Sequence, residues 1–537
     1  MASPYALGQH INISLAPQYL PLYALRTVLR MFIALFFSLL FTAIVGTLAA
    51  KNKRAEKLII PAIDILQSIP VLSFLSITIT GFIHLFPGSF LGPECACIFS
   101  IFTAQVWNMV FGFYQSLKTI PEDMQETCEI FQLSPWQRFW KVEVPCSLSG
   151  LLWNMMVSMS ASWFFVVLAE SISVAHQSIQ LPGLGSYIAQ AIQVHNLRAL
   201  GYAIFTMIVV IFMYDQLLFR PLVAWSDKFN MDSSPDDESQ ESWLLDWIRN
   251  SYFFQKLGVV FLKVRDSFIH FPMLTRLGTT RPIKKSSSSS RTLDYVWTVS
   301  TVILLVGGIR YLGKFILQEL SMHDIIHVFF LGAATASRVL ILIFLSSLLW
   351  IPVGVWIGMR PRLSQTMQPI IQLAAAFPAN LFYPLFVIAI YTFHLNVEIW
   401  VTPLMILGAQ WYILFNVIAG TAHIPRELHL VANNLGLRGW YWWKRLILPG
   451  IFPFYITGAI TAAGGAWNAS IVAEYVSWGH TTYQATGLGA YIQASTTAGD
   501  FPRIALGTAM MCVYVIFFNH LFWRPLYNLA YTRFRLD

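Results

Sequence analysis

Long apolar runs separated by short polar segments make up most of this chain. Runs such as Met31–Ala50 and Val339–Ile357 have the apolar length, about 20 residues, that a helix needs to cross a bilayer. The runs are continuous and do not alternate with polar residues. In lipid, the backbone must satisfy its own polar groups, so continuous runs favour helices over strands. The pattern predicts an all-α polytopic membrane protein.

The same pattern of residues occurs twice. Several positions recur 304 residues later, among them Trp107, Ile120-Pro121, Pro145 and Trp163, which recur as Trp411, Ile424-Pro425, Pro449 and Trp467. Earlier in the chain the offset is 308 residues, as between Arg54 and Arg362 or Pro61 and Pro369. Matches of this density indicate two parallel copies of one structural unit.

Each copy is predicted to hold five helices in the same order. Their approximate ranges are 22–49, 62–86, 95–117, 147–172 and 200–222, then 329–358, 370–394, 399–421, 451–476 and 504–526. A further apolar run, Tyr295–Leu312, gives about eleven transmembrane helices and lets both copies share one orientation. The predicted domains are 20–225, a linker at 226–294, and 295–537 with the extra helix at about 295–316.

Composition and charge support this class and suggest an orientation. Hydrophobic residues make up 56% of the chain and charged residues 11%, whereas a soluble domain has roughly 25% charged residues. The net charge of +8 comes from basic residues spread between helices, so we expect no nucleic-acid partner. Cytoplasmic loops are rich in Lys and Arg. That rule places the N-terminus outside and the C-terminus in the cytoplasm, and the basic excess is expected of a multi-pass inner-membrane protein.

The stretch between the copies has no counterpart in the repeat. Its segment Trp243–Phe271 mixes aromatic and basic residues, which is typical of an amphipathic helix lying at a membrane surface. A plain tether is the alternative interpretation.

Two matched loops carry most of the functional information. Pro121–Pro145 and Pro425–Pro449 each lie between the third and fourth helices of a copy, on the predicted cytoplasmic side. The first is amphipathic and rich in aromatic residues, and large aromatic side chains facing solvent mark interaction sites. We therefore expect a partner to dock on both loops. The candidate docking residues are Glu126, Gln132, Trp136, Phe139, Trp140, Leu430, Gly436, Trp440 and Trp443.

These loops carry a family resemblance. Glu126-Thr127-Cys128, Gln132 and the stretch to Pro145 resemble the coupling motif of ABC importer permeases, in which an acidic-Ala-Ala triplet precedes a glycine and the motif ends in a proline. In the second copy Leu430-Val431-Ala432 lacks the acid, whereas Gly436 is the glycine. Ala169-Glu170 with Gly183–Ile188, and their copies, resemble the nitrate, sulfonate, taurine and bicarbonate branch of that superfamily.

The resemblance implies partners and a mechanism. Two cytoplasmic ABC ATPase subunits would dock on the two loops, and a periplasmic or lipid-anchored binding protein would deliver the cargo. ATP and magnesium would bind in the ATPases, so this chain is expected to bind no cofactor and no metal and to be no enzyme. The implied cargo is a small anion or organic solute of the nitrate, sulfonate or bicarbonate type.

Repeat-matched residues are the candidates for the pathway or its outer gate, because ionisable groups within membrane spans are costly. They are Arg30, Arg338, Glu170, Glu474, His176, His480, Pro70, Pro378, Gly183, Gly185, Gly487 and Gly489. Each arginine either pairs with a glutamate and fixes helix packing, or gives positive potential to an anion pathway. The histidines are turn residues or gate contacts. The prolines are expected to kink the second helices, and the glycines to allow tight turns before a short helix.

An ATP-independent secondary transporter is the main alternative. Such proteins also contain repeats, but they usually have a charged site at mid-membrane, and the paired amphipathic loops would have no purpose in them.

Overall fold

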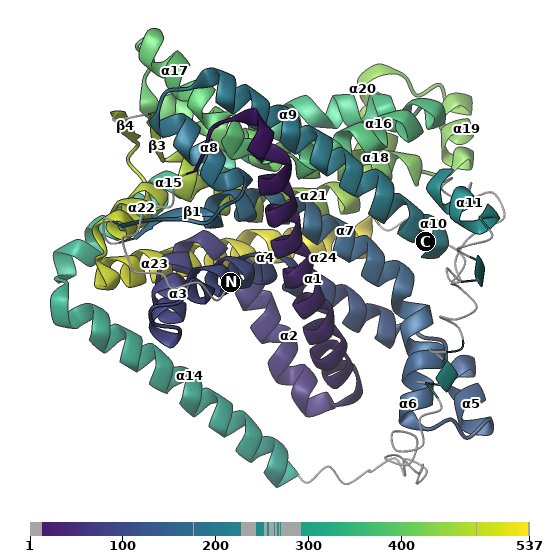
Figure 1. Ribbon diagram of the computed structural model, residues 1–537. Helices are drawn as coiled ribbons and strands as arrows, with labels where there is room; N and C mark the ends of the chain where they lie inside the picture. Colours follow the sequence, from purple (N-terminus) through teal and green to yellow (C-terminus); the bar gives the residue numbers. More distant parts are fainter. Residues whose placement is uncertain are drawn as a thin grey trace.

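A computed structural model describes residues 13–174, 177–226, 243–251, 291–478 and 481–534, with a few isolated positions between 255 and 269. The described chain is a bundle of long helices with two short β-hairpins (Figure 1). This confirms the prediction of an all-α polytopic membrane protein built from two copies of one unit.

The first copy runs from α1 to α10. Its elements are the short 3-10 helix Pro17–Tyr19, α1 Leu20–Lys51, α2 Lys53–Ser68, α3 Val71–Leu85, α4 Leu91–Lys118, α5 Glu122–Ile130, α6 Pro135–Arg138, α7 Val144–Ala169, β1 Ser171–Val174, β2 Gln177–Gln180, α8 Leu184–Gln193, α9 Leu197–Tyr214 and α10 Arg220–Ser226.

The second copy repeats this order. Its elements are α15 Met322–Gly358, α16 Pro361–Ala376, the 3-10 turn η5 Ala379–Leu381, α17 Tyr383–Thr392, α18 Val397–Ala422, α19 Arg426–Asn434, α20 Gly439–Trp442, α21 Leu448–Ala473, β3 Tyr475–Trp478, β4 Thr481–Gln484, α22 Leu488–Ala498, α23 Phe501–Phe518 and α24 Arg524–Arg533. Between the copies lie α11 Trp243–Asn250 and α14 Arg291–Glu319.

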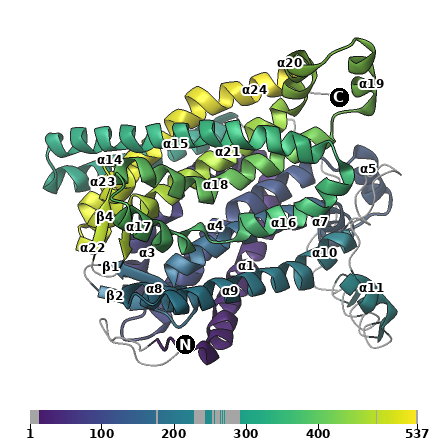
Figure 2. The ribbon, with the colours of Figure 1, turned by 90° about the horizontal axis from the view of Figure 1, so that it is seen from above.

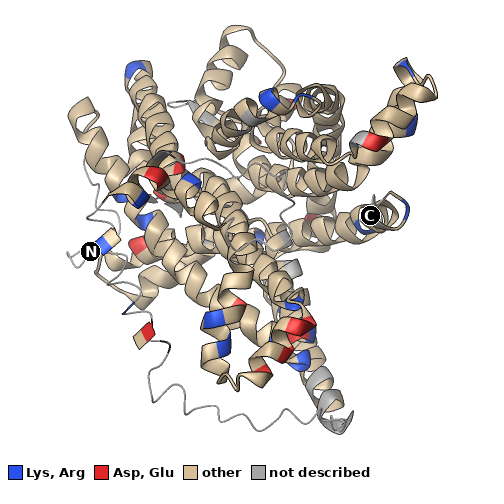
Figure 3. Ribbon diagram, turned by 90° about the vertical axis from the view of Figure 1, so that its right-hand side faces the viewer, with Lys and Arg blue, Asp and Glu red and all other residues tan. Residues whose placement is uncertain are grey.

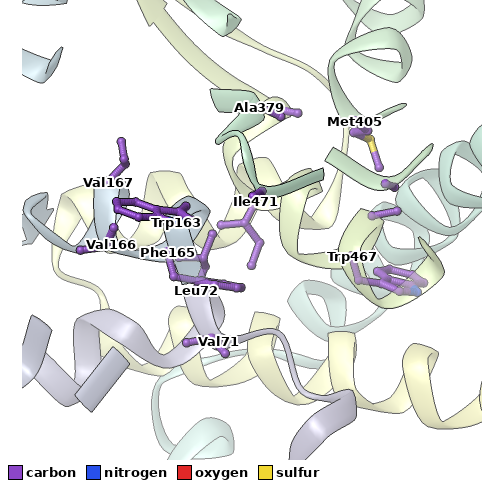
Figure 4. Packing of buried hydrophobic residues seen from close by; sticks show 14 of the residues in the cluster. Val71, Leu72, Trp163, Phe165, Val166, Val167, Ala379, Met405, Trp467 and Ile471 are labelled. Atoms are coloured by element: carbon purple, nitrogen blue, oxygen red, sulfur yellow. The ribbon is translucent and has the colours of Figure 1, made fainter. Parts of the chain in front are cut away.

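The two copies pack through matching helices. Within the first, α4 packs between α1 and α7, and within the second α18 packs between α15 and α21. Between the copies, α3 contacts α21, α22 and α23, and α16 contacts α7 and α9. One hydrophobic core therefore continues through both copies, with Val71, Phe165, Ala379 and Trp467 among its residues (Figure 4).

The bundle has two distinct ends. The hairpin end carries both β-hairpins with α8 and α22, and the loop end carries α5, α11 and α19 (Figure 2). Charged residues are sparse along the helices between these ends (Figure 3).

Prolines interrupt the second helices more strongly than a kink would. Pro70 is in an extended conformation and separates α2 from α3. In the second copy, the chain bends by 68° between α16 and the segment that follows Pro378. These breaks shorten the spans. Nine described helices are long and apolar enough to cross a membrane, or ten with the bent pair. The count of eleven transmembrane helices therefore remains a prediction. Helix α3 has 15 residues, which is fewer than the roughly 20 that a span needs.

Within the described ranges, four π-helical turns occur at matched positions. They are Phe139–Glu143, Asp215–Phe219, Trp443–Ile447 and Asn519–Trp523. Each is followed two residues later by a proline, namely Pro145, Pro221, Pro449 and Pro525. Proline lacks an N–H, and its ring clashes with the carbonyl four residues earlier. A wider turn moves that carbonyl away, so the helix continues through the proline.

The prediction for the end of the fourth helices was wrong. They were expected to reach residues 172 and 476, but α7 and α21 end at Ala169 and Ala473, and antiparallel hairpins follow. The β-branched and aromatic residues of these segments suit strands, and the apolar Ile172 and Val476 extended the predicted helices too far.

Helix α14 is the extra helix expected before the second copy, and it is longer than the sequence indicated. Most of its described side chains are exposed, and it contacts α23 and α2. Of the predicted amphipathic helix 243–271, the structure describes α11 and a few isolated residues, and the rest lies outside the described residues.

Candidate functional site

A buried ionic cluster lies at the hairpin end of the first copy. The guanidinium of Arg30 on α1 contacts Glu94 with Nε and Nη2, both at 2.7 Å, and Glu170 with Nη1 at 2.7 Å. The side chains of Arg30, Glu94 and Glu170 are 4%, 7% and 0% exposed. The hydroxyl of Thr27 also donates to Glu170, at 2.7 Å. One cation and two carboxylates are thus held together almost without water.

The cluster holds the turn before α8. The backbone N–H of Gly185 donates to Oε2 of Glu170 at 2.7 Å, and that of Leu184 donates to the Thr27 hydroxyl at 3.0 Å. Arg30 also donates to the carbonyl of Pro182 at 3.0 Å. Free N–H groups at the first turn of a helix are thereby satisfied. The short helix α8 is fixed to α1, α4 and α7 through this cluster.

The second copy has the same arrangement. Arg338 on α15 pairs with Glu474 at 2.9 Å and with Glu398, and the Thr335 hydroxyl donates to Glu474 at 2.8 Å. Glu474 accepts from the N–H of Gly489 at 2.8 Å. One difference separates the copies, because the Glu398 side chain is 44% exposed whereas Glu94 is buried.

The predicted pairing of each arginine with a glutamate is therefore present, and the clusters are larger than predicted. Sequence reasoning missed Thr27, Glu94 and their counterparts Thr335 and Glu398. The repeat contained the signal, because Thr27 recurs at the offset of 308 residues and Glu94 at that of 304.

The glycines of both turns are required by close approach. A Cβ on Gly183 would lie 2.4 Å from the Glu170 carboxyl group, and one on Gly487 would lie 2.2 Å from that of Glu474. A Cβ on Gly185 or Gly489 would meet the backbone of α7 or α21 at 2.2 or 2.4 Å. Their φ angles are not positive, so space, and not backbone freedom, selects glycine here. His176 and His480 lie outside the described residues.

A cavity of about 300 Å³ lies between the two copies. Its wall includes Ile69 and Val71, which flank Pro70, and Phe377 and Ala379, which flank Pro378. The middle of α4 and α18 and the halves of α7 and α21 nearer the hairpin end complete it. Figure 4 labels Val71, Phe165, Ala379 and Trp467 of this wall. The proline breaks therefore open the helices at the place where the two copies face each other.

The candidate docking residues all lie at the loop end. Glu126 is on α5, Trp136 on α6, and Phe139 and Trp140 in the π turn; Leu430 is on α19, Trp440 on α20 and Trp443 in the matching π turn. Gln132 has a φ of +49° where its counterpart Gly436 has +66°. This left-handed conformation explains a glycine at the position. Cys128 and Ala432, the last residues of the two triplets, are both buried, and burial raises the pKa of the Cys128 thiol.

The two docking segments expose different chemistry. On α5 the exposed residues are mainly acidic, and Ile130 and Phe131 are 78% and 71% exposed beside them. The second segment exposes apolar and aromatic side chains, Leu430, Val431, Leu435, Trp440 and Tyr441, each at least 50% exposed.

The prediction that Trp136, Phe139 and Trp140 are exposed was wrong, because all three are half-buried. The Trp136 and Trp140 rings lie 5.7 Å apart, those of Phe139 and Trp140 5.2 Å apart, and Phe139 also packs on the cluster around Phe113.

Comparisons with known proteins agree with this architecture. The family model described as binding-protein-dependent transport system inner membrane component matches residues 42–220 and 350–524, once in each copy. The chain is similar to the nitrate import permease protein NrtB of Leptolyngbya laminosa, with 26% identity over 174 residues (32% of this chain, 59% of the relative).

It is also similar to the bicarbonate transport system permease protein CmpB of Synechococcus elongatus, with 27% identity over 185 residues (34% of this chain, 60% of the relative). The taurine transport system permease protein TauC of Escherichia coli is 29% identical over 170 residues (32% of this chain, 57% of the relative). The chain thus spans 57–60% of the length of these relatives.

Proposed function

This chain belongs to the family of binding-protein-dependent transport system inner membrane components, and from that premise we propose that it is the permease of an ATP-driven ABC importer. Both halves of the pathway lie in one polypeptide. Two ATPase subunits dock at the loop end, one on α5 with α6 and one on α19 with α20. They bind ATP and magnesium, and this chain carries out no hydrolysis itself.

The single observation that supports this best is the matched pair of docking segments. Each consists of two short helices, α5 with α6 or α19 with α20, and each exposes apolar side chains. The second helix of each pair continues through a π turn into a helix that lines the cavity, α7 or α21. A movement of the docked ATPases would reach the cavity wall through these continuous helices. The cavity would then open alternately to the two sides of the membrane.

Orientation and cargo follow from the same reasoning. The basic loop end faces the cytoplasm and the hairpin end faces outward, toward a periplasmic or lipid-anchored binding protein. The N-terminus is outside, the C-terminus is inside, and the membrane is a bacterial inner membrane. The cargo belongs to the range that the relatives' names cover, small oxyanions and small organic solutes.

The test is co-purification of an ATPase. The permease is expressed with a candidate ABC ATPase and purified through a tag on the permease. The variant Trp440→Ala removes a side chain that is 69% exposed, so the fold does not depend on it. Truncating a tryptophan at an interface costs about 2 kcal/mol or more, which is roughly a thirtyfold loss of affinity. Trp400→Ala is the matched control, because Trp400 is exposed on α18 at the hairpin end.

We expect two ATPase copies with the wild type and with Trp400→Ala, and a reduced amount with Trp440→Ala. The double variant Trp136→Ala with Trp440→Ala is expected to lose the ATPase. If the wild-type chain purifies alone and moves cargo down a gradient without ATP, the secondary-transporter alternative replaces this proposal.

A further inference from the structure

The cavity between the copies is larger than a single inorganic oxyanion needs. Its volume is about 300 Å³, and a water molecule takes about 30 Å³ in the liquid. The space therefore corresponds to about ten water molecules, whereas nitrate and bicarbonate have four heavy atoms each. The size suits an organic solute.

The described cavity wall carries no charged side chain. Its polar residues are neutral, and they include Gln67, Asn108, Ser160, Tyr412 and Asn468. Moving an unpaired ion into a poorly hydrated site is costly. A solute with net charge would meet no countercharge among these described wall residues, whereas a solute with zero net charge needs none.

The buried arginines do not supply that countercharge. Arg30 is paired with two carboxylates, Glu94 and Glu170, and Arg338 with Glu398 and Glu474. Each cluster has a formal charge of −1 when its carboxylates are ionised. The clusters at the hairpin end therefore repel an anion, which removes the support for an arginine-lined anion pathway.

The wall does suit an ammonium group and an apolar body. Half-buried aromatic rings contribute to it, among them Trp107, Phe164, Phe377 and Tyr412. The faces of such rings attract cations, with energies of about 0.5–2 kcal/mol. Asn468 lies on the same wall, and its buried side-chain oxygen has no hydrogen-bond partner among the described residues. A donor N–H from a solute would satisfy it.

Neutral donors in the wall can bind an anionic group on the same solute. Asn108 and Tyr412 occupy matched positions on α4 and α18 and line the cavity from the two copies. The amide of Asn108 accepts from Gln67 at 2.9 Å, which leaves its own N–H groups to donate. Val71, at the positive end of the α3 dipole, belongs to the same wall.

We propose that this cavity binds a small zwitterionic organic solute, with its cationic group against the aromatic rings and its carboxylate or sulfonate at the neutral donors. The proposal rests on the proposed transport function and narrows its cargo to the zwitterions. Inorganic anions are excluded from the cavity.

Equilibrium binding to the full chain, reconstituted in nanodiscs with its ATPase, tests this proposal. Trp107 and Trp467 line the cavity, so intrinsic fluorescence reports occupancy. The probes are taurine, glycine betaine, sodium nitrate and sodium bicarbonate, each titrated into the tens of millimolar range. Gly464→Phe fills the cavity, since Gly464 lines it and a Cβ there meets no atom within 4 Å. Gly307→Phe on α14 is the matched control, because its Cβ also meets nothing within 4 Å.

We expect a saturable response to taurine or glycine betaine, weakened at least tenfold by Gly464→Phe and unchanged by Gly307→Phe, and no response to the two salts. A saturable nitrate or bicarbonate response that Gly464→Phe abolishes would overturn the proposal. So would a wild-type chain that responds to neither zwitterion. Co-purification of the ATPase is scored on the same preparations, so a failure of the importer assignment is seen independently of what the cavity binds.

Discussion

The buried cluster around Arg30 allows a quantitative prediction for Glu170→Gln. Three donors meet the Glu170 carboxylate at 2.7 Å, from the side chains of Thr27 and Arg30 and from the backbone of Gly185. Glutamine has the same shape, but one of its terminal atoms is an N–H₂ group. That group must face either Arg30 and Thr27 or Gly185, so donors meet donors in a site that is 0% exposed.

The expected loss is several kcal/mol. Removing one partner of a buried ion pair costs about 3–5 kcal/mol. Arg30 keeps its two bonds to Glu94, so we expect a value near the lower limit, about 3 kcal/mol. A total stability of about 5–15 kcal/mol makes this a large fraction.

The matched comparison is Glu398→Gln. The Glu398 side chain pairs with Arg338 but is 44% exposed, and exposed pairs contribute about 0–1 kcal/mol. The free energy of unfolding of both variants is measured by denaturant titration in mixed micelles. If Glu170→Gln is no less stable than Glu398→Gln, burial does not determine the strength of these contacts and the reasoning is refuted. A double-mutant cycle between Arg30 and Glu170 then isolates their coupling.

Two further predictions concern single contacts. Gly183→Ala would place a Cβ 2.4 Å from the Glu170 carboxyl group, so we expect a lower unfolding temperature in scanning fluorimetry. Gly201→Ala in α9, where a Cβ meets nothing within 4 Å, is expected not to lower that temperature, because alanine favours a helix. A Gly183→Ala temperature as high as that of Gly201→Ala would contradict the packing argument. Lys51→Met removes an ion pair of 2.8 Å to Glu143, whose side chain is 4% exposed while Lys51 is 43% exposed. The partly exposed pair is expected to contribute about 1 kcal/mol, and an unchanged free energy of unfolding would mean that Arg138 alone satisfies Glu143.

The helical architecture could be predicted because each signal was local and occurred twice. Apolar length predicted the spans, and the repeat fixed their order. Pro70 and Pro378 predicted interruptions correctly, since a proline disturbs the hydrogen bonds of its own helix. The π turns were not predictable in this way, because Pro352, Pro403 and Pro453 also lie inside helices but have no described π turn ending two residues before them.

The hairpins and the full clusters were harder to predict because they depend on contacts across the fold. The strands Ser171–Val174 and Gln177–Gln180 have four residues each, and so short a run does not distinguish a strand from the end of a helix. Glu94 is 64 residues from Arg30, so no helical periodicity connects them. Half-burial of Trp136 follows from its contact with Trp140, which the amphipathic pattern of the loop does not contain.

The two copies differ where their surroundings differ. The clusters that hold α8 and α22 are repeated residue for residue, because each copy must fix the same turn to the same helices. The ion pair of Lys51 with Glu143 is absent from the second copy, where Met359 and Ile447 occupy the matched positions. In the second copy the docking segment exposes Trp440, whereas the matched Trp136 of the first copy is half-buried. The contacts that hold the hairpin end of each copy therefore persist, whereas contacts and surfaces at the loop end, including the Lys51–Glu143 pair, have diverged. That distribution is expected if each docking surface binds a different part of its partner. Only the first surface presents a row of carboxylates, so we expect salt to weaken binding at the first surface more than at the second.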